Sequence, residues 1–213
     1  MLILNMDEKL LSKFDAIADG LAADGIAVID EFLNLEEVKS IGEEDEFKNG
    51  LLRFKKAAIG KAQDRQINES IRGDYIQWID PASASANVQV YLRRLSDLRN
   101  FLNQSLFLSL KDVEVHKTIY PTGSFYKRHL DQFKKDDHRK LSVICYLNDD
   151  WKEDEGGQLR VYFSDRQRDF FPTAGRLVCF RSDLLEHEVL PATRPRMSLT
   201  GWMLDQVVGL RHL

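Results

Sequence analysis

The feature that most constrains the fold is a dense succession of short apolar or alternating runs in the second half of the chain. Turn residues separate the runs, and each run has the length and the β-branched or aromatic content of a strand. The runs span residues 113–120, 141–147, 157–163, 176–180, 188–190 and 197–204. So many short strands with turns between them predict an antiparallel barrel or jelly roll.

The first part of the chain has a different residue pattern, typical of helices. Over residues 7–23, apolar side chains recur at helical spacing, and Gly25 marks the end of the expected helix. A strand is expected at 26–32. Asn34, followed three residues later by Glu37, resembles a capping box that opens a second helix. We therefore expect a helix, a strand and a helix at the entry to the fold.

A further strand is expected at 75–79 and a third helix at 88–102, with one apolar face packed on a sheet. The chain contains no repeat, no low-complexity segment and no linker rich in Gly, Ser or Pro. We therefore predict a single α+β domain over residues 1–213. Residues 1–110 would supply helical support and a substrate loop with its strand, and residues 111–213 the β core.

Composition limits the classes of partner. With 30 Lys and Arg against 34 Asp and Glu, the net charge is −4, which argues against a broad nucleic-acid surface. No stretch approaches the roughly 20 apolar residues of a membrane span. The two cysteines, Cys145 and Cys179, stand in apolar runs and are expected to be reduced core thiols. We expect a cytoplasmic protein with no membrane or nucleic-acid partner, as a monomer or weak oligomer.

Three residues have the pattern of a metal site. His129 and Asp131 are two apart, so in an extended segment their side chains point to the same side, and His187 can complete the set from another strand. Two imidazoles and one carboxylate on a single face are the ligands of non-haem iron(II) oxygenases. Zinc accepts the same donors. The ligand set alone thus leaves an oxygenase and a hydrolase open.

An arginine near the end of the chain favours the oxygenase. Arg196 opens an alternating strand, on which it shares a face with Ser198, Thr200 and Trp202. If that face is the interior, the guanidinium needs an anion, and a carboxylate is its usual partner. Arg194 is the competing candidate, but across Pro195 it lies in the turn and is expected to face solvent.

Several stretches together resemble the double-stranded β-helix of the 2-oxoglutarate-dependent oxygenases, in the prolyl 4-hydroxylase branch. Within it the chain is most similar to the hypoxia-inducible-factor prolyl hydroxylases and their bacterial relatives. The stretches are Tyr120-Pro-Thr-Gly-Ser-Phe-Tyr-Lys-Arg-His-Leu-Asp131, Cys145-Tyr-Leu-Asn-Asp-Asp-Trp151, Gly156-Gly-Gln-Leu-Arg160, Phe180-Arg-Ser-Asp183, His187-Glu-Val189, Ile71-Arg-Gly-Asp-Tyr-Ile-Gln-Trp78 and Gly25-Ile-Ala-Val-Ile-Asp-Glu-Phe32. The resemblance implies that the protein uses Fe(II), with 2-oxoglutarate and O2 as co-substrates. Ascorbate would be an additional cofactor.

The resemblance also implies roles for single residues. The iron ligands would be His129, Asp131 and His187. Arg196 would bind the distal carboxylate of 2-oxoglutarate, with Tyr146 as a second donor. Lining the co-substrate pocket would be Tyr120, and Thr200 would place a hydroxyl beside the iron-bound water.

The implied activity is hydroxylation of a prolyl residue in an intracellular protein, with release of succinate and CO2. The substrate would be a protein or peptide presenting a proline, such as a translation elongation factor or an oxygen-response regulator. Residues 47–80 would close over it. Three alternatives stay open: an oxygenase of the same fold acting on a Lys or Arg side chain or a free amino acid, a zinc hydrolase, and a cupin-like binding module.

Overall fold

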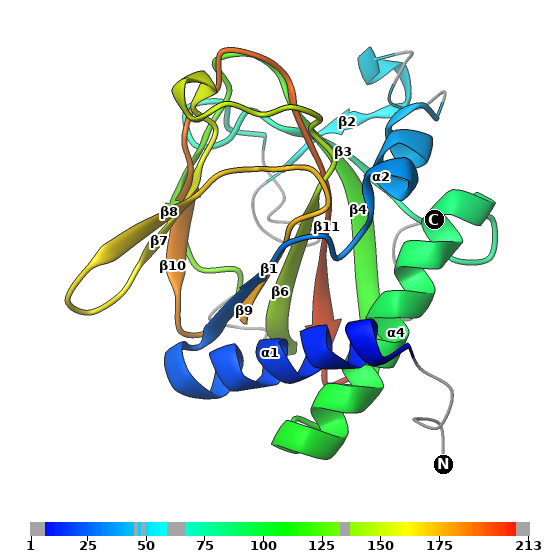
Figure 1. Ribbon diagram of the computed structural model, residues 1–213. Coiled ribbons are helices and arrows are strands. Elements are labelled where there is room, and N and C mark those ends of the chain that lie inside the picture. The colour runs from blue at the N-terminus through cyan, green and yellow to red at the C-terminus, as the bar shows by residue number, and fades with distance from the viewer. Residues whose placement is uncertain (1–6, 45–46, 48–49, 59–66, 133–136, 208–213) are drawn as a thin grey trace.

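The structure is a computed structural model that describes residues 7–44, 47, 50–58, 67–132 and 137–207. Within these residues, the strands form two facing sheets (Figure 1). The major sheet has the order β1-β9-β6-β11-β4-β3-β2, and the minor sheet has the order β5-β10-β7-β8. The strands are β1 (Ile26–Ile29), β2 (Lys55–Lys56), β3 (Tyr75–Trp78), β4 (Asp112–Tyr120), β5 (Tyr126–His129), β6 (Arg139–Tyr146), β7 (Leu159–Tyr162), β8 (Gln167–Phe170), β9 (Leu177–Arg181), β10 (Glu186–Val189) and β11 (Arg196–Leu204).

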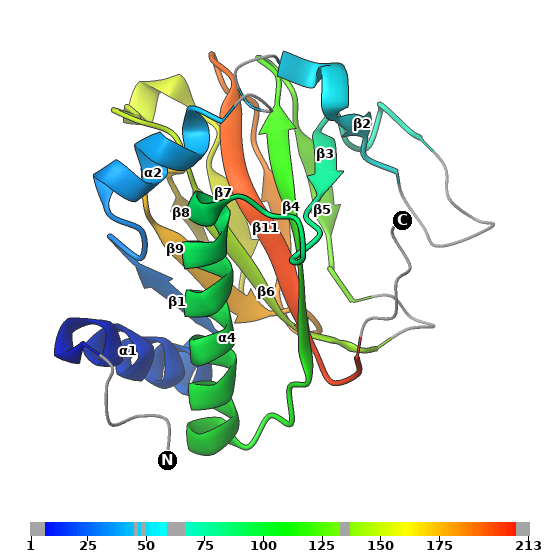
Figure 2. The same cartoon turned by 90° about the vertical axis from the view of Figure 1, so that its right-hand side faces the viewer.

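The helices lie on one side of the major sheet. Among them, α4 (Ala86–Leu106) runs lengthwise along the sheet, and α1 (Glu8–Asp24) crosses near one end (Figure 2). The remaining elements are α2 (Leu35–Gly42) and the 3-10 helices η2 (Gly50–Arg53) and η4 (Glu153–Glu155). The helices therefore cover the outer face of the major sheet, and the minor sheet faces its inner side.

Alternation along the major strands creates two cores. On one face, residues such as Leu199, Met203 and Val143 pack with the helices. On the other, Tyr146 and Ile144 pack with side chains of the minor sheet. Polar residues are concentrated on this second, inward face, where the candidate site lies.

The predicted α+β jelly roll is confirmed, and so are its helices. Asp7 caps α1, which ends at Gly25 with a φ of 72°, a left-handed conformation that glycine adopts without strain. Both bonds of the predicted capping box are present, Glu37 N to Asn34 Oδ1 and Asn34 N to Glu37 Oε2, each at 2.9 Å. The two cysteines are buried and free, as expected.

Four features of the strand prediction need correction. The strand predicted at 26–32 ends at Ile29, because the chain turns and Glu31 adopts a φ of 55°. Three strands had not been predicted as such: β2, β5 and β8 are short and polar, so their apolar pattern is weak. The division at residue 110 stays a prediction, although β1, β2 and β3 from the first part join the major sheet.

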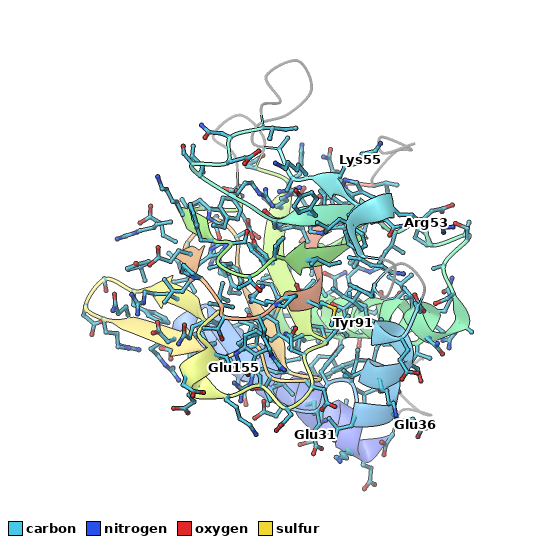
Figure 3. The ribbon with its side chains drawn as sticks, turned by 90° about the horizontal axis from the view of Figure 1, so that it is seen from above. Glu31, Glu36, Arg53, Lys55, Tyr91 and Glu155 are labelled. Carbon is cyan, nitrogen blue, oxygen red and sulfur yellow. The ribbon has the colours of Figure 1, made fainter. Side chains whose placement is uncertain are left out.

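The view from above shows how the start of the chain wraps around the molecule. Arg53 and Lys55 lie at the β2 end, away from Glu31 and from Glu36 of α2 (Figure 3). No helix in the described part of the chain combines the length and apolarity of a bilayer span.

Candidate functional site

The three predicted metal ligands meet between β5 and β10. His129 closes β5 and lies directly opposite His187 of β10 in the antiparallel register, with ring centroids 4.3 Å apart. Asp131 follows two residues after His129. One donor atom from each residue lies within 4.8 Å of the others, so the three could hold one metal ion.

Backbone carbonyls orient both imidazoles. His129 Nδ1 is 2.7 Å from the Lys127 carbonyl oxygen, and His187 Nδ1 is 3.2 Å from that of Leu185. An Nδ1 proton donated to each carbonyl leaves Nε2 with its lone pair. These Nε2 atoms face Asp131, at 3.5 Å from Oδ1 for His129 and 3.7 Å from Oδ2 for His187. Lone pairs that converge in this way call for a cation between them.

Electrostatics support the same protonation states. Burial lowers the pKa of His187 to about 4, with the nearby His129 acting in the same direction, so His187 is neutral at pH 7. Burial alone would raise the pKa of Asp131. The two imidazoles and the Ser142 hydroxyl outweigh it and hold that pKa well below its usual range. The group is thus one carboxylate and a neutral His187 beside His129, as a divalent metal requires.

Arg196, the first residue of β11, is only 1% exposed. Its Nε donates to the Gly157 carbonyl at 3.0 Å, whereas its buried Nη2 has no hydrogen-bond partner in the described part of the chain. The Tyr146 hydroxyl is also buried and has no hydrogen-bond partner among the residues that the structure describes. The guanidinium carbon lies 4.9 Å from the Tyr146 ring centroid and 5.1 Å from that of Tyr120. A buried cation and a hydroxyl donor that both lack an acceptor fit a carboxylate ligand.

Arg194 occupies a different environment. Its side chain is 36% exposed, its Nε lies 3.2 Å from a Glu155 carboxylate oxygen, and its guanidinium stacks on Trp151 at 4.5 Å. It therefore faces outward with an anion already beside it. The placement favours Arg196 over Arg194 as the group that binds a carboxylate.

The other two predicted site residues share the inward face with Arg196. Tyr120 ends β4 directly opposite Arg196, and burial raises the pKa of its phenol well above the usual value, so the hydroxyl stays protonated. Thr200 lies further along β11, with its hydroxyl 3.0 Å from that of Ser198. Their roles toward the co-substrate and the metal's water stay predictions.

Two serines that the sequence did not single out lie behind Asp131. Ser142 Oγ is 2.6 Å from Asp131 Oδ2, and Ser182 Oγ is 2.8 Å from Ser142 Oγ. Both serines are buried. Nothing in their local sequence distinguishes them from serines that merely fill a strand, since the contact arises from the packing of β6 against the turn after β9.

Tyr126 stacks on the His129 ring, with the two centroids 3.6 Å apart, and the Arg72 guanidinium carbon lies 4.2 Å from the Tyr126 ring centroid. Arg72 and Asp74 pair across Gly73, with Arg72 Nε 2.7 Å from Asp74 Oδ1. Asp74 is 2% exposed, and its segment is bonded to the residue before β5 through Gly73 N and the Phe125 carbonyl.

An aromatic group lines the inward face beyond Thr200. The His116 ring lies 5.0 Å from that of Trp78 and 5.4 Å from that of Trp202. Arg139 covers Trp202 at 3.4 Å and pairs with Glu114 at 2.9 Å. Alternation along β11 places Trp202 on this face already from the sequence, as expected. Alternation along β4 could have placed His116 there too, but His116 belongs to no short motif.

Comparison with known proteins agrees with this geometry. A family model described as the 2OG-Fe(II) oxygenase superfamily matches residues 115–204. The hypoxia-inducible factor prolyl hydroxylase of Caenorhabditis elegans is 32% identical over 195 residues, which are 85% of this chain and 27% of that protein. The chain thus spans less than a third of the length of this relative.

Two solved structures have the same fold over nearly the whole chain. A prolyl-4-hydroxylase from Pseudomonas putida is 40% identical with a TM-score of 0.82, and the match covers 91% of this chain and 100% of that one. A prolyl hydroxylase from Trichoplax adhaerens, solved with a peptide fragment of the hypoxia inducible factor oxygen degradation domain, is 27% identical with a TM-score of 0.77 and 94% coverage of both chains.

Proposed function

Because the chain belongs to the 2OG-Fe(II) oxygenase superfamily, in its prolyl 4-hydroxylase branch, we propose that it hydroxylates a prolyl residue of a protein with Fe(II), 2-oxoglutarate and O2. One observation carries the proposal. A buried guanidinium without an anion, Arg196, stands on the inward face beside a His-Asp-His group. A zinc hydrolase or a binding module would leave that cation without a role.

In this proposal, His129, Asp131 and His187 hold the iron, each through one atom. Iron and 2-oxoglutarate together supply the oxidising chemistry, with succinate and CO2 as products. The Lys127 and Leu185 carbonyls fix which nitrogen of each imidazole is presented. The protein thereby sets the ligand geometry before any substrate binds.

Arg196 and Tyr146 then form the far end of the co-substrate site. The guanidinium Nη2 and the phenolic O–H donate to the distal carboxylate of 2-oxoglutarate. Tyr120 packs beside them from β4, with its hydroxyl protonated, and forms a wall that excludes water. Thr200, two residues before Trp202 on β11, offers a hydroxyl toward the metal side of the same face.

The acceptor side of the site lies around β5. The Arg72 and Asp74 pair holds its segment against β5 next to Tyr126, and the region 47–80 would close over a peptide that presents a proline. Residues 48–49 and 59–66 of that region lie outside the described residues. We expect an intracellular protein substrate, and an elongation factor or an oxygen-response regulator remains the expected kind.

The first test is an anaerobic titration of the Fe(II)-loaded protein with 2-oxoglutarate, followed by visible absorption. Chelation of iron by the 2-oxo acid should give a weak charge-transfer band. Asp131→Ala and His187→Ala should lack the band while keeping the wild-type circular dichroism spectrum. A fully metallated wild type without the band would remove the proposed function.

The acceptor needs a second experiment. A cell extract is incubated with the enzyme, with and without 2-oxoglutarate, and hydroxylated residues are mapped by mass spectrometry, with His187→Ala as the matched inactive control. Hydroxyproline that depends on both the enzyme and 2-oxoglutarate is the expected result. The same dependence on lysyl or arginyl residues alone would change the acceptor and keep the oxygenase.

A further inference from the structure

Asp131 accepts a hydrogen bond from a buried chain of two serines. Ser142 Oγ is 2.6 Å from Asp131 Oδ2, and Ser182 Oγ is 2.8 Å from Ser142 Oγ. Ser142 is 1% exposed and Ser182 is 0% exposed. An apolar core needs neither hydroxyl. Their position behind one metal ligand therefore indicates a role toward Asp131.

The direction of the chain follows from counting protons. Each hydroxyl carries one proton, and an ionised carboxylate can only accept. The Ser142 hydroxyl donates to Asp131 Oδ2, so its one proton points to that oxygen. Ser142 can then only accept from Ser182, and the order is Ser182 to Ser142 to Asp131. A bond from a hydroxyl to a charged oxygen is among the stronger kinds of hydrogen bond.

The backbone holds this chain in place at both ends. Ser142 lies inside β6, opposite Phe180 of β9. The Ser182 amide donates to the Lys140 carbonyl at 3.1 Å, and the Gln132 amide, next to Asp131, donates to the Ser182 carbonyl at 3.2 Å. Backbone hydrogen bonds therefore join the segment of Asp131 to that of Ser182, and that of Ser182 to β6, so the carboxylate and the two hydroxyls are held together.

Each carboxylate oxygen faces one imidazole, Oδ1 at 3.5 Å from His129 Nε2 and Oδ2 at 3.7 Å from His187 Nε2. The two oxygens are nevertheless unequal, because Oδ2 alone accepts the Ser142 proton. We propose that Ser142, supported by Ser182, is a positioning residue that keeps Asp131 a metal ligand through one oxygen only. This inference rests on the proposed function.

The consequence concerns the number of open positions on the metal. A metal held here would be bound by one atom each from His129, Asp131 and His187, and its remaining positions would be open to the 2-oxo acid and O2. A carboxylate free to turn could present both oxygens to the metal and leave less room for the co-substrate or O2.

The test measures metal binding and 2-oxoglutarate binding separately in Ser142→Ala. Mn2+ affinity is read from the electron paramagnetic resonance signal of the free ion, and 2-oxoglutarate affinity from the charge-transfer band of the anaerobic Fe(II) protein. We expect Mn2+ affinity to stay within about twofold of wild type, because Asp131 would still offer an oxygen to the metal. The dissociation constant for 2-oxoglutarate should rise about 10- to 100-fold, the size of change that corresponds to the loss of one hydrogen bond to a charged group.

Three further variants serve as controls. Ser142→Thr keeps the hydroxyl and should restore 2-oxoglutarate binding, and Ser182→Ala should give an intermediate loss. Ser96→Ala removes a half-buried hydroxyl of α4 that lies near Arg99 and not Asp131, and it should keep the wild-type balance between the two affinities.

The outcomes separate the possibilities. Unchanged 2-oxoglutarate binding in Ser142→Ala overturns the inference and keeps the proposed function. Loss of Mn2+ binding in that variant also overturns it, because Ser142 would then hold the ligand in place without controlling how many oxygens bind. A wild type without the band overturns the proposed function and this inference with it.

Discussion

Arg196 is a cation that the described part of the chain does not neutralise. Its environment consists of the Tyr120 and Tyr146 rings and one carbonyl, and its Nη2 is unpartnered. Burial of an unpaired charge costs several kcal/mol of folding free energy. Arg196 therefore lowers the stability of the protein without ligands, and a bound carboxylate would remove that cost.

Replacement by an apolar side chain of similar length exposes this cost. Arg196→Met should raise the free energy of unfolding of the protein without ligands by roughly 1–3 kcal/mol. It should also raise the dissociation constant for 2-oxoglutarate by about 10- to 100-fold, because a charge-assisted contact of roughly 1.5–3 kcal/mol is lost. Urea unfolding and the anaerobic titration measure the two effects.

The matched control is Arg194→Met. Because Arg194 already has Glu155 beside it and faces outward, its replacement should leave 2-oxoglutarate binding unchanged. If Arg194→Met weakened binding and Arg196→Met did not, the assignment of the two arginines would be reversed.

His116 makes acid stability depend on one buried imidazole. Burial lowers its pKa to about 3 from 6.5, so between these values the unfolded chain binds a proton that the folded chain does not. Stability therefore falls as pH drops through this range, by about 2 kcal/mol at pH 5 from this residue. His116→Met should lose about 2 kcal/mol less than wild type between pH 7.5 and pH 5.0, as measured by urea unfolding with a chelator present. Equal losses in both proteins would contradict this.

Among single residues, the sequence predicted the positions of those that belong to short motifs. His129, Asp131 and His187 come together as their spacing predicted, and Arg196 lies on the inward face. Ser142, Ser182 and His116 could not be found in this way, because their contacts join strands far apart in the chain. Their significance depends on distance in space and not on local pattern.

At the scale of elements, the entry to β7 shows how one turn supports the site. Gly157 adopts a φ of 70°, and its carbonyl accepts from Arg196 Nε. A Cβ atom there would lie 2.9 Å from Trp151 Cζ2 and 3.4 Å from Arg196 Cδ. Only glycine lets this turn pass so close to the guanidinium.

Gly157→Ala should therefore destabilise the protein by roughly 1–3 kcal/mol, because alanine is strained at this positive φ. It should also weaken 2-oxoglutarate binding, because the added Cβ would crowd the Arg196 side chain. Gly42→Ala, in α2, is the control. No atom lies within 4 Å of its added Cβ, so helix propensity should leave that variant as stable as wild type or more stable by about 0.4–1 kcal/mol. Thermal unfolding measures the stability of both variants, and the anaerobic titration measures their affinity for 2-oxoglutarate. Wild-type stability and affinity in Gly157→Ala would contradict this expectation.

Elements were predictable where their pattern was long or strongly apolar. The helix α4 and the strands β4, β6 and β11 followed from periodicity. The polar strand β5 was not predicted, although it carries His129, because its neighbours Lys127 and Arg128 mask the alternation. Its structure depends on pairing with β10 and on the bridge from Arg72 to Tyr126.

For the whole molecule, the site couples ligand binding to folding. The metal ligands come from two strands of the minor sheet and the segment after β5, and Arg196 comes from the major sheet. Ligands that bind only the folded chain stabilise it in proportion to their saturation. Mn2+ with 2-oxoglutarate, each at about 100 times its dissociation constant, should add about 2.7 kcal/mol per ligand.

This corresponds to a rise in the unfolding midpoint of roughly 5–10 °C per ligand for a chain of this size, measured by calorimetry. Asp131→Ala should lose both shifts, because the 2-oxo acid binds through the metal. Arg196→Met should keep the Mn2+ shift and lose most of the 2-oxoglutarate shift. A metal shift that survives in Asp131→Ala would place the ion elsewhere.

The direct pairing of His187 with His129 has a consequence for how this site can vary over evolutionary time. Side chains on a strand alternate between faces, so an insertion or deletion of one residue in β10 would turn His187 outward and bring Glu186 and Glu188 inward. Lineages that keep the chemistry can exchange outward side chains freely but must conserve the length of this strand. The turn at 164–166 between β7 and β8 is free of that constraint, and changes of length are expected to accumulate there.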